Sequence, residues 1–205
     1  MVEYNKTVQI SNDWFTEATL NKFIQLFGEW QREYYIHRFK YKIMDVPESE
    51  TALTDSNGNV KSSILQADVG IFSKTDDIPE KFLYDKLIYD SLLEENNIVS
   101  SDISEVLVYG KIPRRSIKIP VCFGGTYSPD FMYIIKNKDG SLQYNFIIET
   151  KDVYSNGALR DEEKKKILCG YEFFKQLEAA GYNVIFEEQV KTDNIVAMIK
   201  KIANT

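Results

Sequence analysis

Apolar residues along the chain alternate between helical spacing and short strand-like runs, and this order predicts a mixed α/β (α+β) protein. Recurrence every three or four positions predicts helices within 13–40, part of 80–98, 158–181 and 194–202. Runs rich in aromatic and β-branched residues predict strands at 104–111, 131–135, 144–148 and 183–188. The alternation predicts a mixed central β-sheet flanked by helices.

The N-terminal part of the chain has a different pattern from the rest. A helix with an apolar stripe is followed, from residue 41 to 75, by short strand-like pieces around an Asn57-Gly58 turn signal. We therefore predict an accessory or connecting region over 1–80 and a second domain over 81–205 that carries the candidate chemistry.

A β-hairpin is predicted around the polar segment between 131–135 and 144–148, because two short apolar runs flank a glycine-containing turn. If Asp139 and Gly140 are the central turn residues, each paired position sums to about 279 with its partner, by the geometry of a two-residue hairpin. A longer or bulged loop would shift this register.

That register places three ionisable residues at one end of the hairpin. Asp130 lies opposite Glu149, and directly opposed residues on antiparallel strands project to the same face. Lys151, two residues beyond Glu149, shares that face because strand side chains alternate with period two. We expect the three side chains to converge.

Two carboxylates can hold a Mg²⁺-type ion, and the Thr150 carbonyl can supply a further oxygen ligand. Such an ion polarises a phosphate and activates a water molecule, while the Lys151 ammonium stabilises the developing charge or orients the nucleophile. The pattern therefore indicates phosphodiester hydrolysis. A hairpin that merely ends in solvated charges is the alternative for an isolated motif of this kind.

Glu94 has two possible roles. Ser91 followed by Glu94 is a capping-box pattern, which predicts a helix start and a local role for the carboxylate. The second role is that of a further metal-facing carboxylate, supplied by a helix that packs beside the hairpin.

A short basic strip precedes the hairpin, with no acidic residue between its ends. Its members are Lys111, Arg114, Arg115 and Lys118. Such a strip inside an acidic protein predicts a phosphate-facing DNA contact, and a solvated loop is the alternative.

Composition excludes several classes of protein. The formal net charge of -6 argues against a protein that coats nucleic acid nonspecifically. His37 is the single histidine, and Cys122 and Cys169 stand apart, so zinc, iron-sulfur and histidine-triad sites are not expected. The chain lacks a nucleotide-phosphate loop, a secretion signal and a long apolar run, so we expect a cytoplasmic protein without a membrane partner.

The order of elements from Glu80 onward resembles the core of the PD-(D/E)XK nuclease superfamily. Pro129-Asp130 and Glu149-Thr150-Lys151 correspond to the two halves of its motif. The blocks YDSLLEENNI, VLVYGKIPR, IKIPVCFGGTYSPDFMYII and FIIETKDV resemble the C-terminal endonuclease domain of type III restriction enzyme Res subunits, over roughly residues 81–175.

This resemblance implies a restriction-endonuclease-like fold and a DNA endonuclease that requires Mg²⁺, for which Mn²⁺ can substitute. Asp130 and Glu149 would coordinate the ion, Lys151 would assist the attacking water, and Glu94 falls where the family has a first-helix acid. Double-stranded DNA, a Mod methyltransferase subunit and an ATP-dependent helicase module are the implied partners. ATP enters only through that module, which this chain lacks, and a noncatalytic DNA-binding or coupling role is the alternative.

Overall fold

The computed structural model describes residues 15–36, 38–43, 50–114, 116–138, 140 and 143–204. Contacts divide the chain into two compact units, Met1–Phe39 and Lys40–Thr205. Residues 40–80 therefore belong to the same unit as 81–205, whereas the sequence analysis placed a boundary at residue 80. Among the described residues, no helix is both long and apolar enough to cross a membrane.

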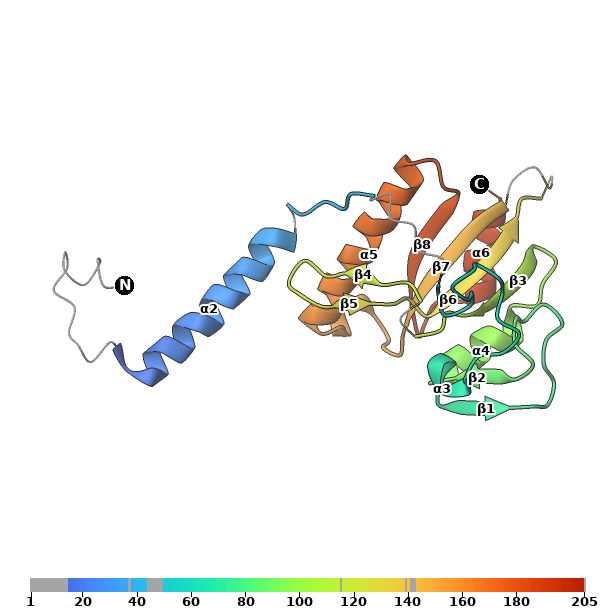
Figure 1. The fold of residues 1–205 in the computed structure, drawn as a ribbon, viewed down its shortest axis with the longest axis horizontal. Coiled ribbons are helices and arrows are strands. Elements are labelled where there is room, and N and C mark those ends of the chain that lie inside the picture. Colours follow the sequence, from blue (N-terminus) through green and yellow to red (C-terminus); the bar gives the residue numbers. More distant parts are fainter. Residues whose placement is uncertain are drawn as a thin grey trace. The chain divides into compact units, whose positions relative to one another are not determined.

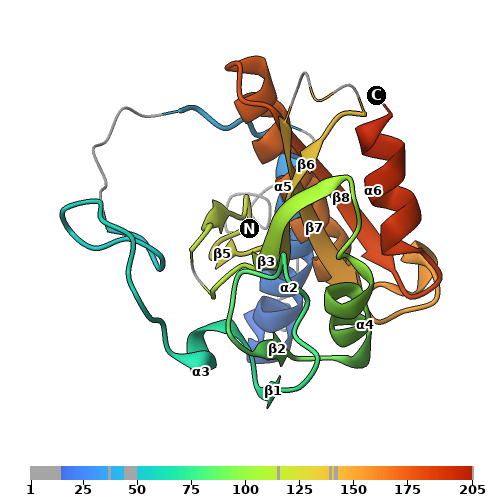
Figure 2. The same cartoon turned by 90° about the vertical axis from the view of Figure 1, so that its right-hand side faces the viewer.

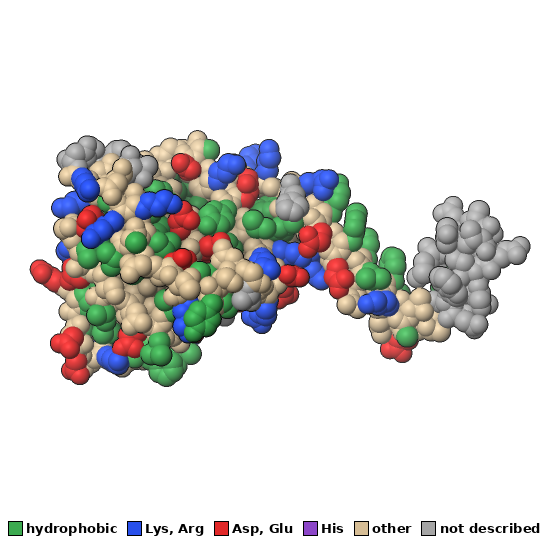
Figure 3. All heavy atoms as spheres, turned by 180° about the vertical axis from the view of Figure 1, so that it is seen from behind, with side chains coloured by type: hydrophobic (Ala, Val, Ile, Leu, Met, Phe, Trp, Pro, Cys, Tyr) green, Lys and Arg blue, Asp and Glu red, His purple; other side chains and the backbone are tan. Residues whose placement is uncertain are grey.

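In the described part of the first unit, helix α2 (Glu17–Ile36) lies in the region where apolar spacing predicted it. Its aromatic side chains form a ladder along one side, because residues three or four apart are neighbours on a helix. The ring centroids of Phe23 and Phe27 are 5.9 Å apart, those of Phe27 and Trp30 are 5.6 Å apart, and those of Trp30 and Tyr34 are 5.2 Å apart. These side chains are exposed, and hydrophobic side chains are visible along α2 in Figure 3.

A four-stranded sheet in the order β3-β6-β7-β8 forms the centre of the second unit (Figure 1). Its strands are β3 (Val106–Lys111), β6 (Phe131–Lys136), β7 (Gln143–Lys151) and β8 (Val184–Val190). The first three strands are antiparallel neighbours, whereas β7 and β8 are parallel. The sheet is therefore mixed, as predicted.

Helices cover both faces of this sheet. The long helix α5 (Asp161–Ala179) lies on one face, and α6 (Ile195–Ala203) lies on the other (Figures 1 and 2). The helix α4 (Leu92–Ser100) belongs to the same unit and contacts β2 and α6. The shorter elements are α3 (Gln66–Val69), β1 (Phe72–Lys74), β2 (Leu87–Tyr89), β4 (Ile119–Pro120), β5 (Thr126–Tyr127) and the 3-10 turn Asn156–Ala158.

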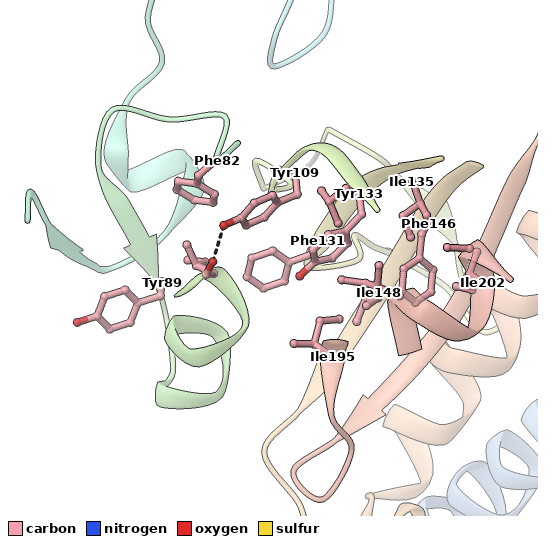
Figure 4. Close-up of a cluster of buried hydrophobic side chains, with 14 of the residues drawn as sticks. Phe82, Tyr89, Tyr109, Phe131, Tyr133, Ile135, Phe146, Ile148, Ile195 and Ile202 are labelled. Atoms are coloured by element: carbon pink, nitrogen blue, oxygen red, sulfur yellow. Dashed lines mark hydrogen bonds between the residues drawn. The ribbon is translucent and has the colours of Figure 1, made fainter. Parts of the chain in front are cut away.

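Alternate residues of the sheet form the hydrophobic core on the α6 side (Figure 4). Tyr109, Tyr133 and Phe146 come from three adjacent strands, and each is at most 1% exposed. The rings of Tyr109 and Tyr133 stack with their centroids 5.5 Å apart. Burial of each such side chain stabilises the fold by roughly 1.5–3 kcal/mol. Because side chains alternate along a strand, the positions between these core residues face the opposite side of the sheet, where the candidate site lies.

The prediction that 80–98 is helical in part is confirmed. The strand β2 comes first, and helix α4 begins after Ser91, where the capping pattern predicted a helix start. The Ser91 Oγ accepts a hydrogen bond of 3.2 Å from the amide of Glu94. In the predicted β-rich segment, Gly58 adopts a positive φ of 78°, as the turn requires, but Thr54 and Val60 form only an isolated bridge.

Candidate active site

The predicted hairpin register is confirmed. Phe131 pairs with Ile148 at one end of the β6/β7 ladder and Lys136 pairs with Gln143 at the other. The amide of Asp130 donates a hydrogen bond of 3.0 Å to the Ile148 carbonyl, which continues the ladder. Asp130 and Glu149 are therefore opposed where the paired strands end.

The connection between these strands is longer than the two-residue turn in the prediction. It runs from the end of β6 at Lys136 to the start of β7 at Gln143. Gly140 has a φ of 73°, and its amide donates to the Asn137 carbonyl. Asp139 lies outside the described residues. The register is unchanged because the longer connection is centred on the same pair of positions.

Asp130 is held at the strand ends by Thr150. The Oδ2 atom of Asp130 accepts hydrogen bonds from the amide of Thr150 at 2.7 Å and from its hydroxyl at 2.6 Å. Burial raises the pKa of Asp130, and the two bonds from Thr150 oppose that rise. The carboxylate orientation is thus set by the backbone and side chain of a single neighbouring residue.

Glu149 forms one ion pair and leaves one oxygen unpaired. Its Oε1 lies 2.7 Å from Nζ of Lys151, which confirms that these two side chains share a face. Its Oε2 is buried and has no hydrogen-bond partner among the described residues. Burial and the charge of Asp130 raise the pKa of Glu149 to about 8, although Lys151 opposes this rise. The single ammonium of Lys151 therefore does not outweigh burial and the neighbouring Asp130 charge.

Lys151 is about one-fifth exposed and lies between two acids. Besides Glu149 it approaches Glu163, on the first turn of α5, at 4.0 Å. Burial disfavours the charged form, yet the charges of Glu149 and Asp130 raise the pKa of Lys151. Its side chain is therefore an ammonium group at neutral pH. Glu163 was not identified as a candidate from the sequence, because it lies in a run of acidic residues with nothing to single it out.

Glu94 takes part in the cap of helix α4 and is also close enough to Asp130 for its pKa to be affected by that charge. The cap is partial, because its Oε2 accepts from the amide of Asp90 at 2.7 Å rather than from that of Ser91. The same oxygen lies 2.6 Å from Nζ of Lys111. Glu94 is buried, and burial raises its pKa, with a further contribution from the charge of Asp130. The residue is consequently neither surface-exposed nor remote from the two strand carboxylates.

The predicted basic strip does not form one surface. Lys111 is 4% exposed and pairs with Asp90 at 2.5 Å as well as with Glu94, so it cannot face DNA as expected. The reason is strand alternation, because Lys111 follows the buried Tyr109 by two positions. Arg114 is exposed and contacts Asp90 at 3.1 Å, Lys118 is exposed, and Arg115 lies outside the described residues.

Two further hydroxyl groups near Asp130 were missed from the sequence. The hydroxyls of Tyr127 and Ser128 are buried without a partner among the described residues. Burial raises the pKa of Tyr127, and the charge of Glu149 contributes next. Helix α5 passes directly over Tyr127 at Gly170, where an added Cβ would lie 1.9 Å from the tyrosine oxygen. Only the segment YSPD indicated these residues, and it identified the aspartate alone.

Within the described parts of the chain, no group of three or more His, Cys, Asp or Glu side chains is arranged to hold a metal ion, and this holds for Asp130, Glu149 and Glu94 as well. The candidate site therefore offers a pair of carboxylates rather than a preassembled triad. Cys122 and Cys169 are free thiols with their sulfur atoms 4.0 Å apart. Cys169 is buried, whereas Cys122 is half-buried.

Comparisons with known proteins agree with this geometry. A family model described as an endonuclease domain matches residues 80–192. The type III restriction-modification enzyme EcoPI Res subunit of Escherichia phage P1 and the EcoP15I Res subunit of Escherichia coli are each 36% identical over 197 residues. The StyLTI Res subunit of Salmonella typhimurium is 25% identical over 193 residues. No solved structure matches the chain significantly.

The alignment with the two Escherichia proteins covers 95% of this chain but 20% of each relative, so the chain spans about one-fifth of their length. The family match covers more than half of the chain and includes both motif halves. The mixed sheet and flanking helices are consistent with a restriction-endonuclease-like fold. The chain therefore belongs to the family of endonuclease domains found in type III restriction enzyme Res subunits.

Proposed function

We propose that this chain is a divalent-metal-dependent DNA endonuclease domain that hydrolyses phosphodiester bonds. Asp130 and Glu149 are the principal metal ligands in this proposal, with Mg²⁺ as the ion and Mn²⁺ as a substitute. The observation that carries it is the buried, unpartnered Oε2 of Glu149 in a side chain that opposes Asp130. An orphaned carboxylate oxygen in such a position is energetically unfavourable unless a cation binds it.

The donor set fits a hard cation. Asp130 and Glu149 supply carboxylate oxygens, the Thr150 carbonyl supplies a neutral oxygen, and Glu94 supplies a further carboxylate directly or through water. A bound ion would polarise the phosphate and lower the pKa of a bound water. Thr150 orients Asp130 through its amide and hydroxyl, so the ligand does not need to reorganise when the ion binds.

Lys151 acts as a cation in this proposal rather than as a base. Its raised pKa keeps the ammonium group protonated. From its position beside Glu149, Nζ can donate a hydrogen bond to the attacking water or to a phosphate oxygen. Glu163 holds the other side of the ammonium group at 4.0 Å.

DNA contacts are proposed at the exposed members of the basic strip. Arg114 and Lys118 are exposed, and Arg115 is retained as a proposed contact from the sequence. Lys111 is excluded because its ammonium group is buried. Since the chain carries a formal charge of -6, these contacts are local, and further affinity would come from other modules.

The proposed partners follow from the relatives. Their names describe Res subunits of restriction-modification enzymes, and the chain spans only a fifth of their length. We propose that target recognition comes from a Mod methyltransferase subunit and that ATP acts through a helicase or translocase region. Both would control when this domain cuts double-stranded DNA.

Plasmid cleavage in the presence of Mg²⁺ or Mn²⁺ tests this function. The chain is assayed alone and within a full-length Res subunit supplied with Mod and ATP. Asp130→Asn should abolish nicking and cutting, while Lys151→Met should retain the ion but slow cleavage by about 10²- to 10³-fold. Asp152→Asn is a matched control, because Asp152 is an exposed carboxylate just beyond the motif.

Metal-independent cleavage, or cleavage that survives Asp130→Asn, would contradict the proposal. DNA binding without cleavage in both contexts would instead support a noncatalytic coupling role. Direct measurement of Mn²⁺ binding separates these outcomes, since the proposed site requires an ion that depends on Asp130.

A further inference from the structure

A second group of charged residues adjoins the proposed metal site. Lys111 lies at the end of β3, opposite Phe131 of β6, and its neighbour Ile112 donates a hydrogen bond of 2.7 Å to the Asp130 carbonyl. The backbone therefore brings Lys111 next to Asp130. Its side chain extends to the opposite side of the sheet from Lys151, toward α4.

The ammonium group of Lys111 bridges two carboxylates. Nζ lies 2.5 Å from Oδ2 of Asp90 and 2.6 Å from Oε2 of Glu94, and the residue is 4% exposed. A lysine side chain is rarely buried to this extent unless its charge is paired. Here one positive charge neutralises two buried or half-buried acids through direct ion pairs, which is the charge-balancing role that a bound cation would otherwise fill.

The electrostatics connect this bridge to the proposed metal site. Burial dominates the pKa of Asp130, and the charges of Lys151 and Lys111 both oppose its rise. Burial raises the pKa of Glu94, the charge of Lys111 opposes this rise, and the charge of Asp130 adds to it. Each lysine has its own pair of acids, namely Asp90 and Glu94 for Lys111, and Glu149 and Glu163 for Lys151.

We propose that the Lys111 ammonium occupies the place of a second divalent cation between Asp90 and Glu94, so that Lys111 limits the domain to one metal ion. This inference rests on the proposed function, because the single ion is the one held by Asp130 and Glu149. Lys111 is then a positioning residue, because its ammonium group donates to Oε2 of Glu94 and holds that carboxylate in place.

Mn²⁺ stoichiometry, measured by equilibrium dialysis and by the electron paramagnetic resonance signal of free Mn²⁺, tests this inference. The wild-type chain should bind one ion at concentrations that saturate the Asp130-dependent site. Lys111→Ala removes both the charge and the bulk and should bind two ions. Lys111→Arg retains the charge and Lys111→Met retains the bulk, so both should bind one.

Two controls isolate the carboxylate pair. Lys118→Ala removes an exposed lysine from the same strip and should leave one ion bound. Asp90→Asn in the Lys111→Ala background should return the count from two to one. In the wild-type background, Asp90→Asn should leave the single ion's affinity within about twofold, because Lys111 rather than metal is its partner.

Two ions on the wild-type chain would overturn the inference, as would one ion on a folded Lys111→Ala variant. If Lys111→Ala does not fold, two measurements still test the inference: the number of Mn²⁺ ions bound by the wild-type chain and the Mn²⁺ affinity of Asp90→Asn. A tenfold loss of Mn²⁺ affinity in Asp90→Asn would identify Asp90 as a metal ligand and contradict the inference. Failure of the proposed function has a different signature, namely no Asp130-dependent ion on the wild-type chain.

Discussion

The two lysine-centred clusters of this domain differ in how completely their charges are paired. Lys111 satisfies Asp90 and Glu94 at 2.5 and 2.6 Å, and Arg114 and a backbone amide add further bonds. Lys151 satisfies one oxygen of Glu149 and leaves the other buried and unpartnered. The first arrangement stabilises the protein as it stands. The second leaves a buried oxygen that a proton, a water molecule or a cation can satisfy, as expected of a binding site.

Glu149→Gln should have the largest effect, because it removes the carboxylate whose second oxygen has no partner among the described residues. The variant lacks a proposed metal ligand, so DNA cleavage should fall to background while the metal-free fold becomes more stable at pH 8. Glutamine resembles the protonated acid that the buried site favours. Cleavage assays and thermal unfolding in EDTA measure the two effects. Glu162→Gln, on an exposed residue, should change neither, and normal cleavage by Glu149→Gln would refute the assignment.

Lys111→Met should have the next largest effect, on stability. Removing one partner of a buried ion pair leaves Glu94 without its counter-ion and should cost about 3–5 kcal/mol. Denaturant unfolding measures the loss, with Lys118→Met as the control. A loss below about 1 kcal/mol would mean that this cluster is not a structural pair.

The pH dependence of stability sharpens the comparison. Between the ordinary glutamate pKa near 4.5 and about 8, folded Glu149 retains its proton while the unfolded chain has lost it. This group therefore stabilises the fold fully below pH 4.5 and loses that contribution as the pH rises through 8. Metal-free wild-type protein should lose a few kcal/mol relative to Glu149→Gln across this range. Parallel curves for the two proteins would contradict the expectation.

Ser91→Ala should have the smallest effect. The Ser91 hydroxyl caps α4, which carries Glu94, so its loss should cost about 1 kcal/mol. The Asp130-dependent Mn²⁺ affinity should change little, because Lys111 and the Asp90 amide still hold Glu94. Calorimetry of unfolding and of Mn²⁺ binding measures both quantities, and a larger change in binding than in stability would argue that the cap positions the acid.

The sequence predicted the hairpin site well because its information is local. The apolar runs fixed the strands, and a symmetric connection preserved the pairing of Asp130 with Glu149 even though the turn was longer than assumed. Alternation along the strand then placed Lys151 beside Glu149. These features require only the period of a β-strand.

The second cluster was missed because its contacts join distant segments. A run of basic residues suggested a surface strip, yet Lys111 belongs to the buried alternation that includes Tyr109. Its partner Asp90 lies just after the strand β2, which the sequence did not predict. Strand alternation indicates which face Lys111 occupies, but its pairing with Asp90 and Glu94 cannot be read from spacing, because it depends on how α4 packs.

Gly170 shows how narrowly the site is built. An added methyl group there would collide with the Tyr127 hydroxyl, at 1.9 Å, and with the Phe186 ring, at 2.8 Å. Tyr127 lies three residues before Asp130 in the sequence. Helix α5, which contains Gly170, also supplies Glu163 beside Lys151. The absence of a single carbon atom thus lets α5 lie close to the segment that leads into Asp130, and even alanine would force the Tyr127 and Phe186 rings to shift.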